Sequence, residues 1–255
     1  MAHERTLLEL DEQAKLMNTL FEQYLSTHVL PEEGMPTLHQ FRVNAKYFTK
    51  LWTKILPADP NSKILDAGCG AGSLLWWLQS REFRNTEGVE LCGDLVDIAN
   101  QLGVNGVVTG DIREHLRTHA NSYDVIVLRD VIEHFPKDDV LSLLELCLKS
   151  LRDAGRIIVQ VPNAESPFFG RTMYGDFTHE VAFTARSLRQ VLGACGFRDF
   201  AFFPHGPVLV DFKPKSLVAY AMRKLYFTLI RMMVFLDTIK MNAVLTDSIV
   251  AVAYK

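Results

Sequence analysis

The sequence predicts an α/β fold: a Rossmann-like, doubly wound sheet that is mostly parallel and carries helices on both faces. Short apolar runs alternate with helical stretches from residue 61 onward, the order in which strands and helices follow each other in such folds. A glycine-rich turn over residues 66–72 stands directly between the first apolar run and the helix after it. Because ligands of these sheets bind beyond the carboxyl ends of the strands, functional residues are expected at that edge.

The composition indicates a globular chain without a nucleic-acid partner. Its 255 residues are 48% hydrophobic and 22% charged, enough apolar material for one large core or at most two small ones. A net charge of −3 provides no basic field for nucleic acid.

The four cysteines lie far apart, which suits neither a zinc site nor a disulfide framework, so no metal is expected. Residues 1–5 lack a secretory pattern, so a cytoplasmic location is expected.

Residues 1–60 are predicted to form an N-terminal helical cap. Pro31, Gly34 and Pro36 separate two helices, and Pro57 and Pro60 end the cap. The apolar residues at helical spacing are Leu10, Ala14, Met17, Phe21 and Tyr24 in the first helix, then Phe41, Ala45, Phe48, Trp52 and Ile55 in the second.

The sheet is expected to begin after this cap. Asp138 or Asp139 is the expected N-cap of one helix, and Gly155 and Gly196 stand just past helix ends. Strands are predicted over residues 63–67, 87–91, 106–109, 123–128 and 156–161, and helices over 74–78, 95–101, 140–151 and 184–195.

Acids at successive strand ends predict a nucleoside site. Asp66 stands two residues before the first glycine of a G-x-G-x-G turn, where a carboxylate sits badly with a pyrophosphate but suits a ligand carrying ammonium and sulfonium groups. Glu90 ends the second strand, where an acid can accept hydrogen bonds from both ribose hydroxyls. Asp111 follows the third strand and could accept from an adenine amino group, with Ile112 beside the ring.

With these features in place, residues 61–163 resemble the class I S-adenosylmethionine-dependent methyltransferases, in particular the small-molecule type that includes ubiquinone-biosynthesis enzymes. The segment 123–135 is similar to the D-V-x-E-H stretch of that family. The resemblance implies S-adenosylmethionine as the cofactor and a seven-stranded sheet whose last strand, over 248–253, is antiparallel. Residues 61–255 would form the methyltransferase domain, with a helical insert at about 213–240. The implied cofactor-binding residues are Asp66, Ala67, Gly68, Cys69, Gly70, Gly72, Glu90, Leu91, Asp111, Ile112 and Arg129.

Two histidines are candidates for a general base. His134 follows the fourth strand, and His179 lies in a polar loop that resembles the D-x-T-H segment of the same subgroup. Histidine titrates in the range that proton abstraction from a hydroxyl needs, and we expect His179 to be the base and His134 to orient it. Each could instead be structural.

Tyr174 and Asp176 are expected to contact the acceptor. Arg129 could also orient the acceptor, or could pair with Asp130 or Glu133. The other histidines, at 3, 28, 39, 115, 119 and 205, are expected to be solvated.

The segment 216–236 is apolar but contains Arg223, Lys224 and Arg231, which makes it a poor transmembrane span. It is expected to form a helix that covers the core, lids the active site or builds a homodimer interface, with peripheral membrane contact as the less favoured alternative. Its layout weakly resembles methyltransferases associated with polysaccharide assembly, which implies a sugar or a lipid-linked glycan as acceptor.

The predicted function is therefore transfer of a methyl group from S-adenosylmethionine to a small-molecule or glycan/lipid-linked acceptor, at oxygen. One alternative is a non-catalytic S-adenosylmethionine-binding regulatory module. The other is a nicotinamide-dependent reductase, which Asp66 and the spacing of the glycines disfavour.

Overall fold

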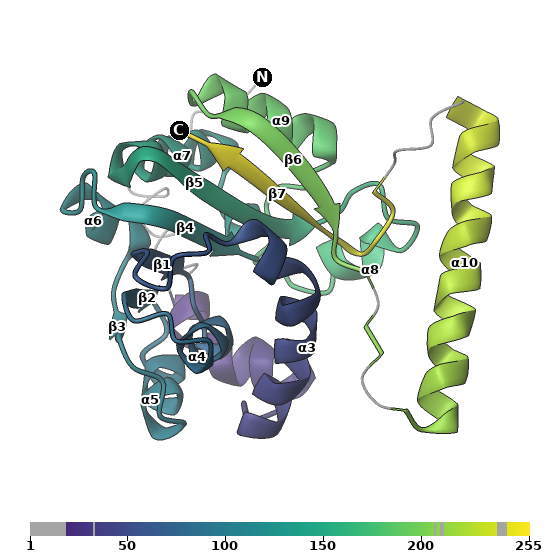
Figure 1. The fold of residues 1–255 in the computed structure, drawn as a ribbon, viewed down its shortest axis with the longest axis horizontal. Coiled ribbons are helices and arrows are strands. Elements are labelled where there is room, and N and C mark those ends of the chain that lie inside the picture. The colour runs from purple at the N-terminus through teal and green to yellow at the C-terminus, as the bar shows by residue number, and fades with distance from the viewer. Residues whose placement is uncertain (1–18, 33, 207, 210–211, 239–243) are drawn as a thin grey trace, which may run out of the picture.

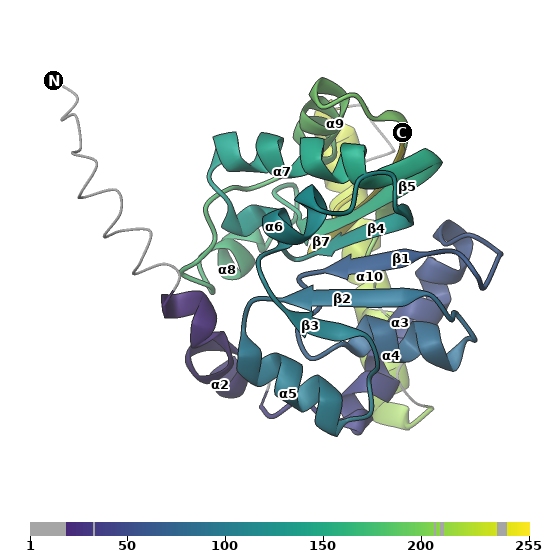
Figure 2. The same ribbon diagram turned by 90° about the vertical axis from the view of Figure 1, so that its left-hand side faces the viewer.

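The computed structural model describes residues 19–32, 34–206, 208–209, 212–238 and 244–255. It contains a seven-stranded sheet in the order β3-β2-β1-β4-β5-β7-β6, drawn in Figures 1 and 2. The strands are β1 (Ile64–Ala67), β2 (Thr86–Glu90), β3 (Val107–Thr109), β4 (Tyr123–Arg129), β5 (Leu151–Pro162), β6 (Arg198–Pro204) and β7 (Ser248–Tyr254). β1 to β5 are parallel, and β7 is antiparallel to both of its neighbours. This confirms the predicted fold class and the antiparallel last strand.

Helices cover both faces of the sheet (Figure 2). In β4, Val125 and Val127 pack toward one face while Ile126 and Leu128 pack toward the other, as the alternation of a strand requires. The first face is covered by α3 (Leu38–Ile55), α4 (Ser73–Ser80) and α5 (Gly93–Gln101), and the second by α6 (Ile112–Arg117), α7 (Lys137–Ser150) and α9 (Ala185–Ala194). Burial on both sides explains why the middle of β4, Val125 to Leu128, is apolar without interruption.

The cap joins the first face of the sheet through α3. Thr37 begins this helix with a capping box that includes Gln40. The predicted apolar stripe is largely buried: Phe41, Phe48, Trp52 and Ile55 all lie in the core, and Ala45 packs partly against it. Before it lie η1 (Leu25–Val29) and α2 (Leu30–Glu32), and Leu10, Ala14 and Met17 fall outside the described residues.

Some element boundaries differ from the predictions. α7 begins at Lys137 after Pro136, so neither Asp138 nor Asp139 is its N-cap; both acids lie in the first turn, where they favour the helix dipole. β5 begins at Leu151 instead of residue 156. β6 had no predicted range, since its partly exposed aromatic residues on a sheet edge give no clean alternation. The short η2 (Ile132–His134) and α8 (Phe169–Met173) were also unforeseen.

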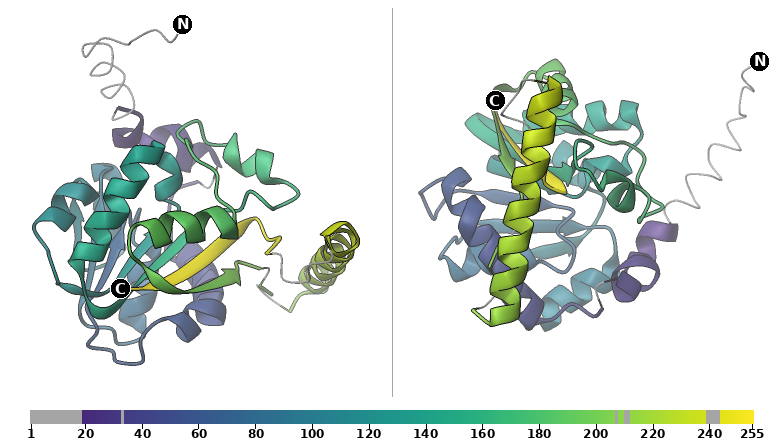
Figure 3. Two further views of the ribbon diagram at one scale, coloured as in Figure 1. Left: turned by 90° about the horizontal axis from the view of Figure 1, so that it is seen from above. Right: turned by 90° about the vertical axis from the view of Figure 1, so that its right-hand side faces the viewer.

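The insert forms one helix, α10 (Pro214–Thr238), which stands at one side of the molecule (Figures 1 and 3). No residue of α10 whose side chain is described is buried, so the interpretation that it covers the core is wrong. Within the described part of the chain, no helix is long and apolar enough to cross a membrane.

Candidate active site

A cleft of about 1230 Å³ opens at the carboxyl edge of the parallel strands, where the fold predicts a ligand. The turn after β1, the ends of β2 and β4, and the cap all line it. Among the predicted cofactor residues, Gly68, Cys69, Gly70, Glu90, Leu91, Asp111, Ile112 and Arg129 line the cleft, whereas Asp66, Ala67 and Gly72 do not.

The turn after β1 holds its shape through glycine backbone conformations. Gly68 has φ +78°, and a Cβ there would meet Val131 Cγ2 at 2.5 Å, so the position accepts no side chain without displacing the chain after β4. Gly70 has φ +56°, and its N–H donates to Glu90 Oε2 at 2.8 Å. The same carboxylate accepts from the Cys92 N–H at 2.9 Å, so Glu90 ties the turn to the end of β2. Burial raises the pKa of Glu90, against the effect of these two N–H donors.

Asp66 lies beneath the turn and is fully buried. Neither of its carboxylate oxygens has a hydrogen-bond partner among the described residues. Burial is the main reason that its pKa rises to about 7, and the nearby Arg129 guanidinium opposes the rise. A buried carboxylate with no partner is costly unless a cation pairs with it, and its position next to the turn suits an ammonium group of a bound ligand.

Asp111 caps α6 and is held by its own neighbour. Its Oδ1 accepts from the Arg113 backbone N–H at 2.7 Å, and the Arg113 guanidinium donates to Oδ2 at 2.7 Å. Burial opposes ionisation, but the hydrogen bonds from Arg113 outweigh it and lower the pKa of Asp111. The carboxylate therefore faces the cleft in its charged form, with lone pairs still open to an amino group.

A hydrogen-bond chain fixes the tautomer of His134. The Thr178 hydroxyl donates its single proton to Asp176 Oδ1 at 2.6 Å, so toward His134 Nδ1, 2.8 Å away, it can only accept. His134 must then carry its proton on Nδ1 and keep a free lone pair on Nε2. Burial, and next the neighbouring His179, lower the pKa of His134 to about 4, so the ring is neutral near pH 7.

His179 and Glu133 lie beside His134. The rings of His134 and His179 are 4.8 Å apart between centroids, and His179 does not line the cleft. His179 Nδ1 and both oxygens of the buried Glu133 have no partner among the described residues. Burial, and then the charge of Asp130, raise the pKa of Glu133. One ligand atom from each of Glu133, His134 and His179 lies within 4.8 Å of the others, and two histidines with a carboxylate are a set that could hold a divalent cation.

Comparison with known proteins assigns the family. A family model described as a methyltransferase domain matches residues 38–201, more than half of the chain. The chain belongs to the S-adenosylmethionine-dependent methyltransferase family. This confirms the resemblance inferred from the glycine turn and the strand-end acids, and with it the enzyme class.

Individual relatives of this methyltransferase differ in the atom they methylate. It is 23% identical over 195 residues to a phosphoethanolamine N-methyltransferase from Plasmodium falciparum, a match covering 69% of this chain and 71% of that one. It is 30% identical over 109 residues to a ubiquinone biosynthesis O-methyltransferase from Erwinia tasmaniensis, covering 41% of this chain and only 44% of that enzyme.

Two solved structures share the fold of the methyltransferase. A SAM-dependent methyltransferase from Archaeoglobus fulgidus superposes with a TM-score of 0.64 at 20% identity, over 91% of this chain and all of the other. Phosphoethanolamine N-methyltransferase 2 of Haemonchus contortus, solved with S-adenosyl-L-methionine, gives 0.60 at 14% identity, over 92% of this chain and 60% of that one. At these identities the likeness establishes the fold.

The cap brings residues to the cleft that the sequence analysis did not single out. Phe21, Tyr24 and His28 line the cleft. Tyr24 stacks on His28 with ring centroids 4.9 Å apart, and both Phe21 and Tyr24 meet the ring of His134 edge-on. Helical periodicity had marked Phe21 and Tyr24 as apolar positions, but that signal does not distinguish a core from a cleft wall.

Several histidines of the methyltransferase correct the expectation that they are solvated. His28 and His205 line the cleft. Burial, and next the charge of Arg129, lower the pKa of His205 to about 4. His115 Nε2 lies 2.8 Å from the Tyr123 hydroxyl, and His119 Nδ1 lies 2.7 Å from the His115 carbonyl oxygen. His39 is exposed as expected, and residue 3 lies outside the described residues.

The two predicted acceptor contacts lie outside the cleft lining. Tyr174 is 84% exposed. Asp176 is buried and bonded to Thr178 and Tyr24, so its contacts are with the protein. Their contact with an acceptor stays a prediction. Arg129 does line the cleft, with its guanidinium 5.6 Å from the ring centroid of Phe48 and one nitrogen 3.4 Å from Ser73 Oγ.

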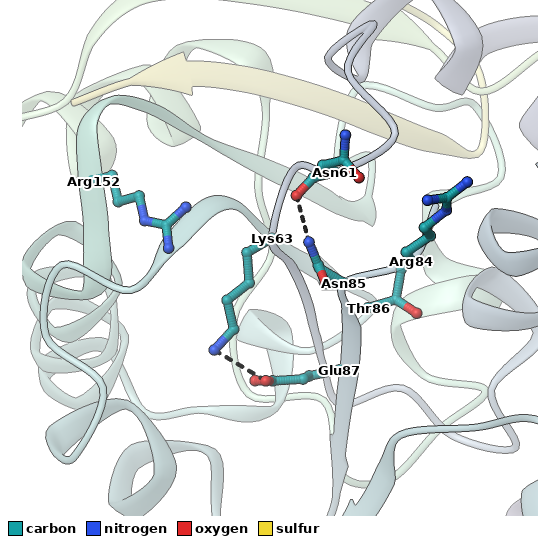
Figure 4. A pocket seen from close by; sticks show the side chains of 7 residues that line it. All are labelled: Asn61, Lys63, Arg84, Asn85, Thr86, Glu87 and Arg152. Carbon is teal, nitrogen blue, oxygen red and sulfur yellow. Dashed lines mark hydrogen bonds and ion pairs between the residues drawn. The ribbon is translucent and has the colours of Figure 1, made fainter. Parts of the chain in front are cut away.

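A smaller hollow of about 460 Å³ lies at the opposite, amino edge of the strands (Figure 4). Most of its charged groups are already paired: Lys63 lies 3.0 Å from Glu87, and Arg152 lies 2.9 Å from Asp124. Asn85 donates to the carbonyl oxygen of Asn61. Since ligands of such sheets bind at the carboxyl edge, we place the active site in the larger cleft.

Proposed function

We propose that this methyltransferase moves the methyl group of S-adenosylmethionine to a hydroxyl oxygen, with His134 as the general base. The observation that carries the proposal is the chain Asp176–Thr178–His134, which leaves the Nε2 lone pair of a neutral histidine at a cleft wall. His179 does not line the cleft, so the geometry favours the reverse of the roles expected from the sequence.

The residues of the cleft fit S-adenosylmethionine. Glu90 suits the ribose hydroxyls, and Asp111 with Ile112 suits the adenine. Asp66 does not itself line the cleft, but its unpartnered carboxylate lies beneath the turn that does and suits the ammonium group. When bound, the cofactor supplies a methyl group on a sulfonium, which is already activated for displacement. What remains for the protein is to align the acceptor and exclude water, effects that are worth about 7–11 kcal/mol in favourable cases.

A base is most useful when the nucleophile is a hydroxyl. A neutral amine attacks with its own lone pair, whereas a hydroxyl oxygen must lose its proton as the new bond forms. A positioned base contributes about 10²–10⁴-fold to such a step. The relatives include both O- and N-methyltransferases, and the free Nε2 of His134 supports oxygen.

The part of the cleft away from the predicted cofactor residues suits a polar acceptor. Asn44, Tyr47, Gln160 and His205 line it, and all four can donate or accept hydrogen bonds. A volume of about 1230 Å³ exceeds the ~300–1,000 Å³ of ordinary ligand pockets, so a cofactor and an acceptor can share it. These features support a small molecule or a glycan headgroup with several hydroxyls, and they favour an enzyme over a binding module with a filled acceptor site.

The proposal is tested with pairs of polyhydroxylated acceptors that differ in one group, hydroxyl against amine, and isotope-labelled methyl donor. We expect label on oxygen, and a His134→Ala variant that binds S-adenosylhomocysteine normally but transfers the label far more slowly. Preferential labelling of the amines would overturn the assignment to oxygen. A chelator distinguishes the remaining possibility: if it abolishes transfer and Zn²⁺ restores it, the cluster of Glu133, His134 and His179 acts as a metal site and His134 is not the base.

A further inference from the structure

The segment that contains α10 differs in charge from the rest of the chain. α10, from Pro214 to Thr238, carries four of the 27 basic residues and one of the 30 acidic ones, Asp237, although the whole chain has a net charge of −3. The remainder of the protein is therefore acidic while this segment is basic. Any partner of the segment that is recognised through charge must be anionic.

One side of α10 faces the body of the protein. The ring of Tyr226 stacks on Phe168 with centroids 5.9 Å apart. Tyr220, Phe227 and Ile230 are partly covered, and at 100° per residue they fall on the same side of the helix as Tyr226. These residues identify the side of the helix that faces the body, and so which side points away.

The opposite side of α10 is a broad apolar face that no other described residue covers. Its members are Val218, Met222, Leu225, Leu229, Met232 and Leu236, which are between 51% and 78% exposed. Leu217 and Phe235 widen the same face on one side and Met233 on the other. Lys224 and Arg231, one heptad apart, flank it along one edge. Soluble proteins rarely expose an apolar surface of this extent unless it binds something.

We propose that α10 lies on a lipid bilayer with anionic headgroups. Its outward side chains would enter the boundary between headgroups and acyl chains, while the bases at the flank extend to the headgroups. Lying flat also agrees with the absence of a spanning helix among the described residues. The proposal concerns binding to a membrane and does not depend on the reaction or the acceptor.

A second copy of this chain is the competing occupant, and the charges disfavour it. Two such helices packed face to face would bring together four bases from each helix and only one acid, Asp237, at the end of each. In a coiled coil, the positions beside the apolar seam usually carry opposite charges. Here Ala219, Ala221, Tyr226 and Thr228 occupy those positions.

The attachment of α10 to the sheet links the proposed membrane contact to the cleft. The chain enters the insert from His205 and returns from it to Ser248, and both residues line the cleft. The His205 N–H donates to the Ser248 carbonyl oxygen at 3.3 Å, which closes the base of the insert. A bilayer bound by α10 is thus connected to the acceptor side of the active site.

Flotation of the full chain with vesicles tests the proposal. We expect binding to phosphatidylcholine vesicles that contain phosphatidylglycerol and much weaker binding to phosphatidylcholine alone. The variant K224Q/R231Q should partition about 25-fold less, since a base near an anionic surface contributes about fivefold. L225Q/L229Q should partition less by 100-fold or more, on the order of the loss expected for two buried leucines.

Matched controls come from the body of the protein. K54Q/R117Q removes two exposed bases, and V108Q/L141Q removes two exposed apolar side chains, all outside the insert. Both should bind vesicles like the wild type, and thermal unfolding checks that every variant is folded. Absence of wild-type flotation on anionic vesicles overturns the proposal, as does equal binding to neutral ones. Sedimentation showing a dimer that L225Q/L229Q dissociates would assign the face to a second copy instead.

Discussion

The hydroxyl of Tyr24 donates a 2.7 Å hydrogen bond to Asp176 Oδ2, across 152 positions of the sequence. Burial, and then the hydrogen bond and charge of Asp176, raise the pKa of Tyr24, so the hydroxyl keeps the proton that it donates. The same carboxylate accepts from Thr178, and its Oδ2 lies 3.5 Å from His28 Nδ1. The buried Asp176 therefore connects Tyr24 and His28 of the cap with Thr178 in the loop before α9.

Tyr24→Phe should loosen the cap while leaving the sheet intact. A hydrogen bond to a charged group contributes about 1.5–3 kcal/mol, so opening of residues 19–32 should become at least tenfold more frequent. Hydrogen exchange followed by mass spectrometry measures this directly. Ser26→Ala, which removes an exposed bond from its hydroxyl to the Gln23 carbonyl oxygen, is the control and should leave exchange of the cap nearly unchanged. Unaltered exchange in Tyr24→Phe would mean that other contacts hold the cap.

His134→Ala should lower turnover about 10²–10⁴-fold, with affinity for S-adenosylhomocysteine nearly intact, because proton transfer belongs to the transition state. His39→Ala, which removes an exposed histidine, should be silent. The pKa of about 4 means that the wild-type base becomes protonated, and activity falls, only as the pH drops through that value. Initial rates between pH 4 and 8 measure both effects. A wild-type profile that falls near pH 6.5 instead would contradict the buried, neutral His134.

Asp66→Asn should raise the stability of the ligand-free protein and lower its affinity for S-adenosylmethionine. The folded-state pKa of about 7 exceeds the ordinary value of 3.8, so the wild type loses stability as the pH rises between these values. The amide of the variant cannot ionise. The difference in free energy of unfolding, in favour of the variant, should therefore grow across this pH range to about 1–3 kcal/mol, or roughly 2–10 °C in Tm. Thermal unfolding at pH 4 to 8 measures it, with the exposed Asp97→Asn as control. A gap that does not change with pH would show that Asp66 is already ionised in the fold.

Glu90→Ala should weaken cofactor binding by about 1.5–3 kcal/mol through the lost ribose hydrogen bonds, and by more if the turn loosens. The second effect follows from the bonds that Glu90 accepts from Gly70 and Cys92, which hold the turn in shape before any ligand binds. Calorimetry with S-adenosylhomocysteine gives the total, and Glu145→Ala, an exposed acid on α7, should bind like the wild type. Unchanged affinity in a folded Glu90→Ala protein would refute the ribose assignment.

The sequence by itself determined the fold class and the edge of the sheet at which the cleft lies. The glycine turn and the acids at positions 66, 90 and 111 are local features whose place in the chain fixes their place near the sheet edge, because parallel strands all end on one side. Periodicity likewise predicted the buried stripe of α3, since Phe41, Phe48, Trp52 and Ile55 recur at the spacing of one helix face.

The tertiary structure alone decided the surroundings of His134. Neither the tautomer of His134 nor the burial of Asp176 follows from spacing. The tautomer depends on the loop before α9 meeting the chain after β4, and Asp176 is bonded to Tyr24 only when the cap folds against that loop. The same holds for α10: its pattern predicted a helix with an apolar face, and only the packing of Tyr226 on Phe168 shows that this face points away from the protein. Hydrophobic periodicity shows which side of a helix is apolar. Which part of the protein that side meets is set by contacts with residues far away in the sequence.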